Sequence, residues 1–248
     1  MPLYLSENRN VVFFHIPKTG GTSIESWLVN LLDSKQILFH KFILEDMLVT
    51  PQHLGYSTIQ KLIGEEVFAK SYKFMIVRNP FDRLESEFFY RVKIGGIKLG
   101  KYPERYFSYW LVEVLNVYRN NPSIFDNHLR PQIYYYGQDV NFFKFESGLD
   151  EIANQIAKSL MFSEIPKMEH KKTSERKSVI WTKKAFEMAK EVYKADFHTF
   201  NYSNDLCESN GQVVRRNKTS LLLKYKMYRA LNLAKAIVKR LLDVGAVK

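Results

Sequence analysis

Three short runs rich in apolar residues predict strands, and the amphipathic stretches around them predict helices. The runs cover residues 11–16, 73–77 and 140–145, and short apolar runs bounded by turn signals are typical of buried strands. Elsewhere, apolar residues recur at spacings of three and four, as on one face of a helix. These stretches are residues 22–32, 57–63, 80–93, 103–120, 150–160 and 182–195. Alternating strands and helices predict an α/β fold with a central parallel sheet flanked by helices.

The segment between the first strand and the first helix has the features of a phosphate-binding loop. Gly20 and Gly21 let the backbone pass close to an anion, and the following helix N-terminus offers N–H groups and a positive dipole end. Lys18 adds a positive charge, but it precedes both glycines, whereas the lysine of a Walker A loop follows the last one. The alternative is an ordinary strand–helix turn with a solvated lysine.

A second strand–turn–helix segment follows at residues 74–86. Arg78 stands where the strand ends, at the edge where α/β proteins bind ligands. Asn79 is a good N-cap, and Ser86 lies about two helical turns further along the same face. Arg78 and Ser86 are therefore expected to converge on one phosphate. The alternative is that Arg78 pairs with Asp82 or Glu85 and that Ser86 only packs.

Together, the two segments resemble the nucleotide-binding motifs of the PAPS-dependent sulfotransferases, where PAPS is 3′-phosphoadenosine-5′-phosphosulfate. In that family a Pro-Lys-Thr-Gly-Gly-Thr-like loop holds the 5′-phosphosulfate, and an Arg-Asn-Pro-x-x-Arg-Leu-x-Ser-like segment holds the 3′-phosphate. The resemblance implies a P-loop-like α/β fold and PAPS as the donor. The residues it implies for binding PAPS are Pro17, Lys18, Thr19, Gly20, Gly21, Thr22, Ser23, Arg78 and Ser86.

Longer stretches are similar to the carbohydrate branch of that family, which includes heparan sulfate 2-O-sulfotransferase and bacterial relatives. They are residues 53–91, almost continuously, with 127–132 and 143–146, within a resemblance that covers about residues 10–202. Residues 193–202 resemble the usual end of the family's sequences, except that Asn201 stands where glycine is common. The branch implies an acceptor hydroxyl on a glycan or glycolipid.

The resemblance also implies catalytic roles for two residues. Lys18 would stabilise the leaving phosphate, and His53 lies where the resembling enzymes carry a catalytic histidine, so it is the preferred general base. His128 or an acidic residue is the alternative base. The polar loop with His128, Arg130 and Gln132 is expected to contact the acceptor, although His128 fits a structural role equally well. A sulfuryl group carries less charge than a phosphoryl group, so we expect no metal to be required.

The family closes a polar, basic loop over the nucleotide, and residues 170–178 have that composition. Lys172, Thr173 and Ser174 are therefore candidate PAPS contacts by resemblance. The alternative is a solvated loop.

Charge is distributed unevenly along the 248 residues. The net charge is +11, of which residues 212–248 carry +9 and residues 1–211 carry +2. This asymmetry predicts a sulfotransferase domain over residues 1–210 and a basic tail over residues 211–248, with an amphipathic helix from residue 221 to 247. The tail helix can pack on the domain, pair with a second copy or lie on an anionic membrane surface.

Two other function classes remain as alternatives. One is a P-loop-type nucleotide kinase, which lacks support because no Walker A motif is present. The other is a basic module that binds polyanions or membranes through the tail, although the nearly neutral body argues against that as the main function. A single cysteine, Cys207, excludes an intrachain disulfide and a cysteine-based zinc site. Without a signal peptide or a long apolar segment, we expect a bacterial cytoplasmic enzyme that binds no nucleic acid.

Overall fold

A five-stranded sheet with the order β3-β1-β2-β4-β5 forms the centre of the computed structural model, which describes residues 3–6, 9–32, 35–37, 43, 47–169, 178–205, 212–214 and 219–245. β2, β4 and β5 are parallel, as expected, while β1 pairs antiparallel with both β2 and β3. The α/β fold with a central sheet is therefore confirmed. The strands are β1 (Leu3–Leu5), β2 (Asn10–Phe14), β3 (Lys35–Ile37), β4 (Tyr72–Val77) and β5 (Asn141–Lys144).

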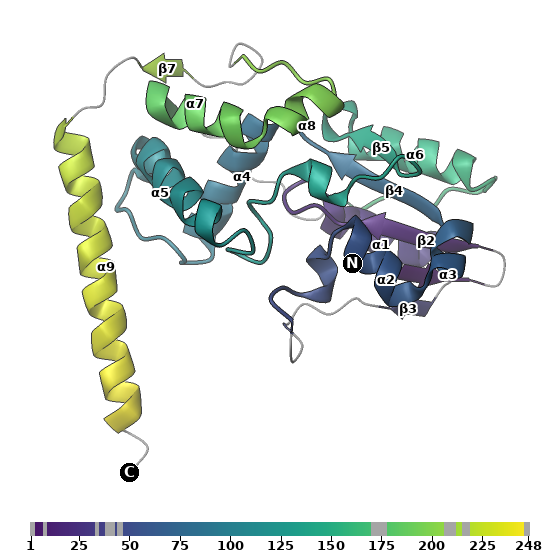
Figure 1. The fold of residues 1–248 in the computed structure, drawn as a ribbon, viewed down its shortest axis with the longest axis horizontal. Helices are drawn as coiled ribbons and strands as arrows, with labels where there is room; N and C mark the ends of the chain where they lie inside the picture. Colours follow the sequence, from purple (N-terminus) through teal and green to yellow (C-terminus); the bar gives the residue numbers. More distant parts are fainter. Residues whose placement is uncertain are drawn as a thin grey trace.

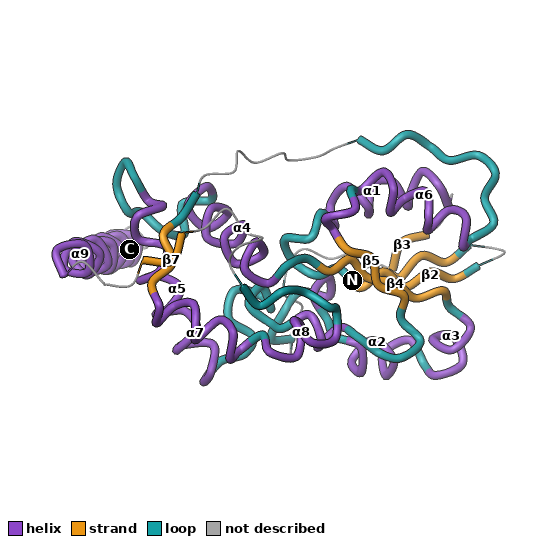
Figure 2. The backbone as a smooth tube through the Cα atoms, turned by 90° about the horizontal axis from the view of Figure 1, so that it is seen from above, coloured by secondary structure: helices purple, strands orange, loops and turns teal. Residues whose placement is uncertain are grey.

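Helices cover both faces of this sheet, which explains why its central strands are apolar without alternation. Phe13 and Phe74 stack with ring centroids 4.8 Å apart on the face covered by α1 and α6. Val12 and Met75 point to the opposite face, towards α2 and α3. Figure 2 shows these two helical layers on either side of the strands. The helices are α1 (Gly21–Leu32), α2 (Tyr56–Ile63), α3 (Glu65–Lys70) and α6 (Leu149–Ser159).

A second group of elements, the helical lobe, packs beside the sheet around its own apolar core (Figure 1). Aromatic rings dominate this core: Phe81 and Phe107 both contact the ring of Trp181, which is fully buried. The lobe consists of α4 (Pro80–Lys93), α5 (Phe107–Asn120), α7 (Lys183–Val192), α8 (Lys194–Thr199) and the parallel pair β6 (Ile180–Thr182) and β7 (Gln212–Val214).

The tail is helical, as expected, and forms α9 (Thr219–Gly245). Its N-terminal half contacts the 3₁₀ helix η2 (Pro103–Tyr106), and the ring of Tyr228 lies against Gly100 in the loop before η2. Figure 1 shows the rest of α9 extending past the body. Since β7 pairs with β6, the residues after 211 also add a strand to the helical lobe. Within the described residues, no helix is both long enough and apolar enough to cross a membrane.

The other element boundaries differ from expectation by a few residues. The first strand ends at Phe14, which leaves His15 and Ile16 to the following loop, and the helix expected over 182–195 divides at Tyr193 into α7 and α8. Three further 3₁₀ turns connect the elements: η1 (Pro51–His53), η3 (Gln132–Tyr135) and η4 (Phe145–Ser147).

Candidate active site

The first expected motif is a tight turn between β2 and α1. Lys18 and Gly20 both have left-handed backbone conformations, with φ of 71° and 84°, which bring the chain from the strand directly to the helix N-terminus. Gly21 must lack a side chain, because a Cβ there would lie 2.4 Å from the ring of His15. The loop therefore lies at the carboxyl end of a parallel strand and at the N-terminus of α1, where phosphate groups commonly bind.

The second expected motif lies against the first. Arg78 follows β4, and its Nη1 donates a hydrogen bond to the carbonyl oxygen of Lys18 at 3.1 Å. The Asn79 side chain caps α4 by accepting from the N–H of Phe81 at 2.9 Å. On the same helix, the ring of Tyr90 lies 4.2 Å from the Lys18 ammonium. The half-buried Ser86 precedes Tyr90 by one turn, so α4 carries both residues along one side.

Gln132, expected from the sequence to contact the acceptor, is buried against the backbone of Arg78. It is fully buried, and its side-chain amide bonds to both the N–H and the carbonyl of Arg78, each at 2.8 Å. The carboxylate of Asp196 in turn accepts from the backbone N–H groups of Gln132 and Ile133. A substrate contact for Gln132 is therefore unsupported, and its side chain positions Arg78 instead.

His53 is paired with a carboxylate that the sequence did not indicate. Its Nδ1 donates to Oδ2 of Asp126 at 2.7 Å, which fixes the tautomer and leaves Nε2 as the proton-accepting atom. Thr50 holds the same carboxylate with its hydroxyl and its backbone N–H, at 2.7 and 2.6 Å. This is the arrangement that a histidine base requires, with the imidazole oriented by a third group.

The Asp126 carboxylate reaches His53 because of an unusual turn. Phe125, Asp126 and Asn127 are all left-handed, with φ of 56°, 60° and 62°, a conformation that is costly for side-chain-bearing residues and is concentrated at functional sites. Cross-links hold the turn in place: the Asn127 side chain donates to the His53 carbonyl, and Arg91 donates to the Phe125 carbonyl.

Burial sets the protonation state of this pair. It lowers the pKa of His53 to about 4, although the hydrogen bond to Asp126 opposes the shift. Burial alone would raise the pKa of Asp126, but the hydrogen bonds from His53 and Thr50 hold it below its ordinary value. At neutral pH the pair is therefore a neutral imidazole beside a carboxylate.

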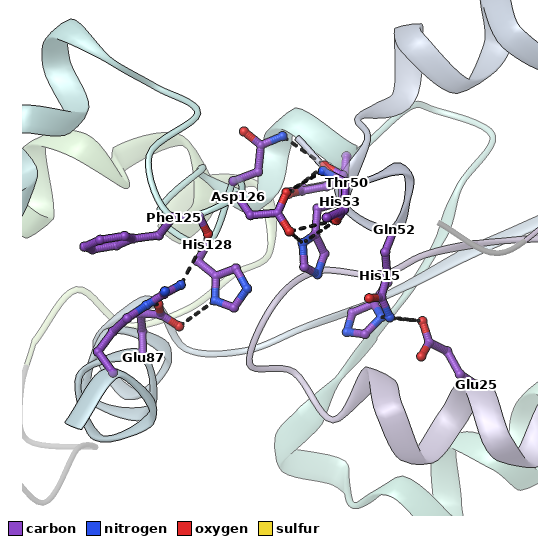
Figure 3. A network of polar contacts seen from close by, with 12 residues as sticks. His15, Glu25, Thr50, Gln52, His53, Glu87, Phe125, Asp126 and His128 are labelled. Atoms are coloured by element: carbon purple, nitrogen blue, oxygen red, sulfur yellow. Dashed lines mark hydrogen bonds and ion pairs between the residues drawn. The ribbon is translucent and has the colours of Figure 1, made fainter. Parts of the chain in front are cut away.

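Three histidine–carboxylate pairs lie in a row (Figure 3). His15 bonds through Nδ1 to Glu25, and His128 bonds through Nδ1 to Glu87 at 2.7 Å. The ring of His53 lies between them, with centroids 5.4 Å from His15 and 5.0 Å from His128. Burial alone would raise the pKa of Glu87, whereas His128 and Arg91 hold it below its ordinary value. The row therefore contains three oriented imidazoles, each with a carboxylate partner: Glu25 and Glu87 are buried, and Asp126 is half-buried.

This row also bears on metal binding. His53, Asp126 and His128 each offer a ligand atom within 4.8 Å of the other two, a spacing that can hold a cation. Hydrogen bonds already join His53 to Asp126 and His128 to Glu87. Both bonds engage Nδ1, so the Nε2 atoms of the two histidines are the ones that can accept a proton or bind a cation.

Of the remaining candidate binding residues, the structure describes Arg130 but not residues 172–174. Arg130 is half-buried, donates to the Asn127 side chain and lies over the ring of Tyr134, a few residues from His128. Lys172, Thr173 and Ser174 lie outside the described residues, so their contact with PAPS stays a prediction.

Comparison with known proteins gives one finding. The sequence profile of the sulfotransferase family matches residues 1–203. Among curated proteins and among solved structures, no significant match is found. The matched region contains the whole site described above and ends before α9.

Proposed function

The chain belongs to the sulfotransferase family, and we propose that it transfers the sulfuryl group of PAPS to a hydroxyl of a carbohydrate or glycolipid by in-line displacement. The observation that carries the proposal is the neutral, buried His53, oriented by Asp126 within the same site as Lys18 and Arg78. The carbohydrate acceptor rests on the resemblance of residues 53–56 and 127–132 to that branch of the family.

In the proposed reaction, Nε2 of His53 takes the proton of the acceptor hydroxyl as the hydroxyl oxygen bonds to sulfur. The bond from sulfur to the bridging oxygen breaks, and its electron pair leaves with adenosine 3′,5′-bisphosphate. Lys18 faces this leaving group and offsets its charge, as a preorganised cation does in phosphoryl transfer. No step requires a metal, so a chelator is expected to leave turnover unchanged.

Arg78 and Ser86 are proposed to hold the 3′-phosphate, which does not react. Arg78 also donates a hydrogen bond to the Lys18 carbonyl, so replacing Arg78 would disturb both proposed phosphate sites. Ser86→Ala is the cleaner variant, because it deletes one hydroxyl on α4 and leaves the loop contact in place.

Thermal shift tests the donor assignment. PAPS should raise the melting temperature more than ATP does, and Ser86→Ala should reduce both this shift and the preference for PAPS over adenosine 5′-phosphosulfate, which lacks the 3′-phosphate. Ser159→Ala, at the exposed end of α6, is the matched control and should behave as the wild type does. Stronger stabilisation by ATP would favour a nucleotide kinase and overturn the proposal.

An acceptor screen with radiolabelled PAPS tests the transfer itself. Label should pass to a glycan or glycolipid with the wild type and not with His53→Ala, although His53→Ala should bind PAPS normally. Transfer that depends instead on His128 would move the general base to that residue. Transfer to non-carbohydrate hydroxyls alone would contradict the proposed acceptor.

A further inference from the structure

Over residues 219–235, whose side chains the structure describes, α9 has one face docked on the body and one that is exposed. On the docked face, Tyr225 is 4% exposed and donates to the Glu113 carboxylate, which also pairs with Arg229. One turn later, the Asn232 side chain donates to the Lys98 carbonyl at 2.8 Å. These contacts fix the rotation of the helix about its axis.

The opposite face is apolar and exposed. At about 100° per residue, Leu223 and Met227 lie roughly 160° and 200° around the helix from Tyr225, and Leu231 lies at roughly 240°. The exposed fractions of Leu223, Met227 and Leu231 are 63%, 52% and 50%. Large apolar side chains that recur at this spacing and face solvent indicate a binding surface.

Lysines border this apolar stripe on both sides. With Tyr225 again as the origin, Lys226 lies at about 100°, and Lys224 and Lys235 lie at about 260° and 280°; all three are exposed. Lysines in these positions can extend their charged ends to the phosphate level of a lipid layer while their stems cover apolar surface. We call Leu223, Met227, Leu231 and these three lysines the outer face.

We propose that the outer face of α9 binds the surface of a bilayer that contains anionic lipids. The charge of the helix selects this occupant: residues 219–245 contain six basic residues and one acid, Asp243. Two copies packed along the outer face would bring lysine borders against each other with no acidic partner, whereas anionic headgroups complement both borders. An apolar stripe between basic borders is the pattern of helices that lie in a membrane interface.

Co-sedimentation of the full chain with vesicles tests this proposal. The protein should bind vesicles of phosphatidylcholine with phosphatidylglycerol, should not bind phosphatidylcholine alone, and should be released by high salt. Met227→Asp with Leu231→Asp should reduce binding at least tenfold, as should the triple change Lys224→Glu, Lys226→Glu and Lys235→Glu. Circular dichroism should show that both variants remain folded.

Matched controls come from α2 and α7, away from the outer face. Leu62→Asp replaces another half-exposed leucine, and Lys61→Glu with Lys183→Glu and Lys184→Glu makes the same charge change on exposed lysines. Both should bind as the wild type does. The proposal fails if the wild type ignores anionic vesicles, if the charge control loses binding equally, or if light scattering shows a dimer that Met227→Asp with Leu231→Asp converts to monomer.

Discussion

Burial changes the pH range over which the His53 imidazole can accept a proton. Its pKa is lowered to about 4, so above that pH the folded enzyme holds it in the neutral form that a base needs. A solvated histidine would titrate near about 6.5.

We therefore expect kcat/KM of the wild type to be flat from pH 6 to 8 and to fall as pH drops towards 4. In Asp126→Asn the imidazole loses its orienting carboxylate, and turnover should fall by about two decades or more. Steady-state rates across pH, with PAPS saturating, measure both effects. A midpoint near 6.5 in the wild type would show that His53 is solvated in the working enzyme.

Lys18 is expected to act on the transition state and to contribute little to folding. Lys18→Ala should lower turnover by about two decades or more, the scale of losing one oxyanion-type donor at about 3 kcal/mol. The melting temperature should change little, because Lys18 is a half-buried loop residue outside the apolar cores, with its ammonium over the ring of Tyr90. Lys61→Ala, on the exposed side of α2, controls for the loss of one positive charge. Near-normal turnover in Lys18→Ala would remove this role.

The residues that orient the histidines were the part of the site that the sequence could not reveal. His53 and Lys18 were candidates because of their motifs, but Asp126 lies 73 positions from His53, and Glu87 lies 41 positions from His128. No periodicity predicts such pairs. The left-handed turn at Phe125–Asn127 also carries no glycine to signal it.

At the scale of elements, the start of α4 links the stability of the fold to donor binding. Asn79→Ala removes the cap and should cost about 0.5–2 kcal/mol of unfolding free energy. It should also weaken PAPS affinity, because Arg78 precedes this turn and Ser86 follows it. Denaturant titration and isothermal calorimetry measure the two effects.

Thr182→Ala is the control, because it removes the equivalent cap of α7, where the Thr182 hydroxyl accepts from the Ala185 N–H. Stability should fall by a similar amount, and PAPS affinity should not change. Equal loss of PAPS affinity in both variants would show that the affinity falls with the overall stability of the fold and does not depend on the start of α4.

The spacing of apolar residues predicted the principal helices and the parallel strands, but it did not predict the short elements. β1 and β3 have three residues each, too few for an alternation to be visible, and they pair with each other across a long separation in the sequence. The interruption at Tyr193 has a tertiary cause as well: its hydroxyl donates to the Leu129 carbonyl, so the chain turns there to meet the active-site loop.

At the scale of the whole molecule, the site lies where two separate apolar cores meet. His53 comes from the side of the sheet and Asp126 from the side of the helical lobe. Buried polar contacts join the two sides, above all the chain of bonds from Asp196 to Gln132 to Arg78. The geometry of the candidate site therefore depends on the position of the helical lobe relative to the sheet.

The three tryptophans allow this coupling to be measured. Trp27 reports on the sheet, while Trp110 and Trp181 report on the helical lobe. In urea, Trp27→Phe and the double variant Trp110→Phe with Trp181→Phe should each show one fluorescence transition that coincides with circular dichroism. Adding Gln132→Leu should separate the midpoints seen by the two reporters. Coinciding midpoints after that change would mean that Gln132 is not the coupling residue.

Gly100 allows Tyr228 of α9 to pack closely against the body of the protein. Its φ of 77° and the 2.7 Å that a Cβ would leave to the Tyr228 hydroxyl mean that any larger residue pushes Tyr228 aside. That ring can swing away, but a side chain at this φ also strains the loop, so the damage would fall first on the attachment of the helix. Under the proposed membrane binding, Gly100→Val should therefore loosen the attachment of α9 to the body and leave the outer face free to bind lipid. A glycolipid acceptor, as proposed, should then be sulfated more slowly by this variant, whereas a freely diffusing acceptor should not.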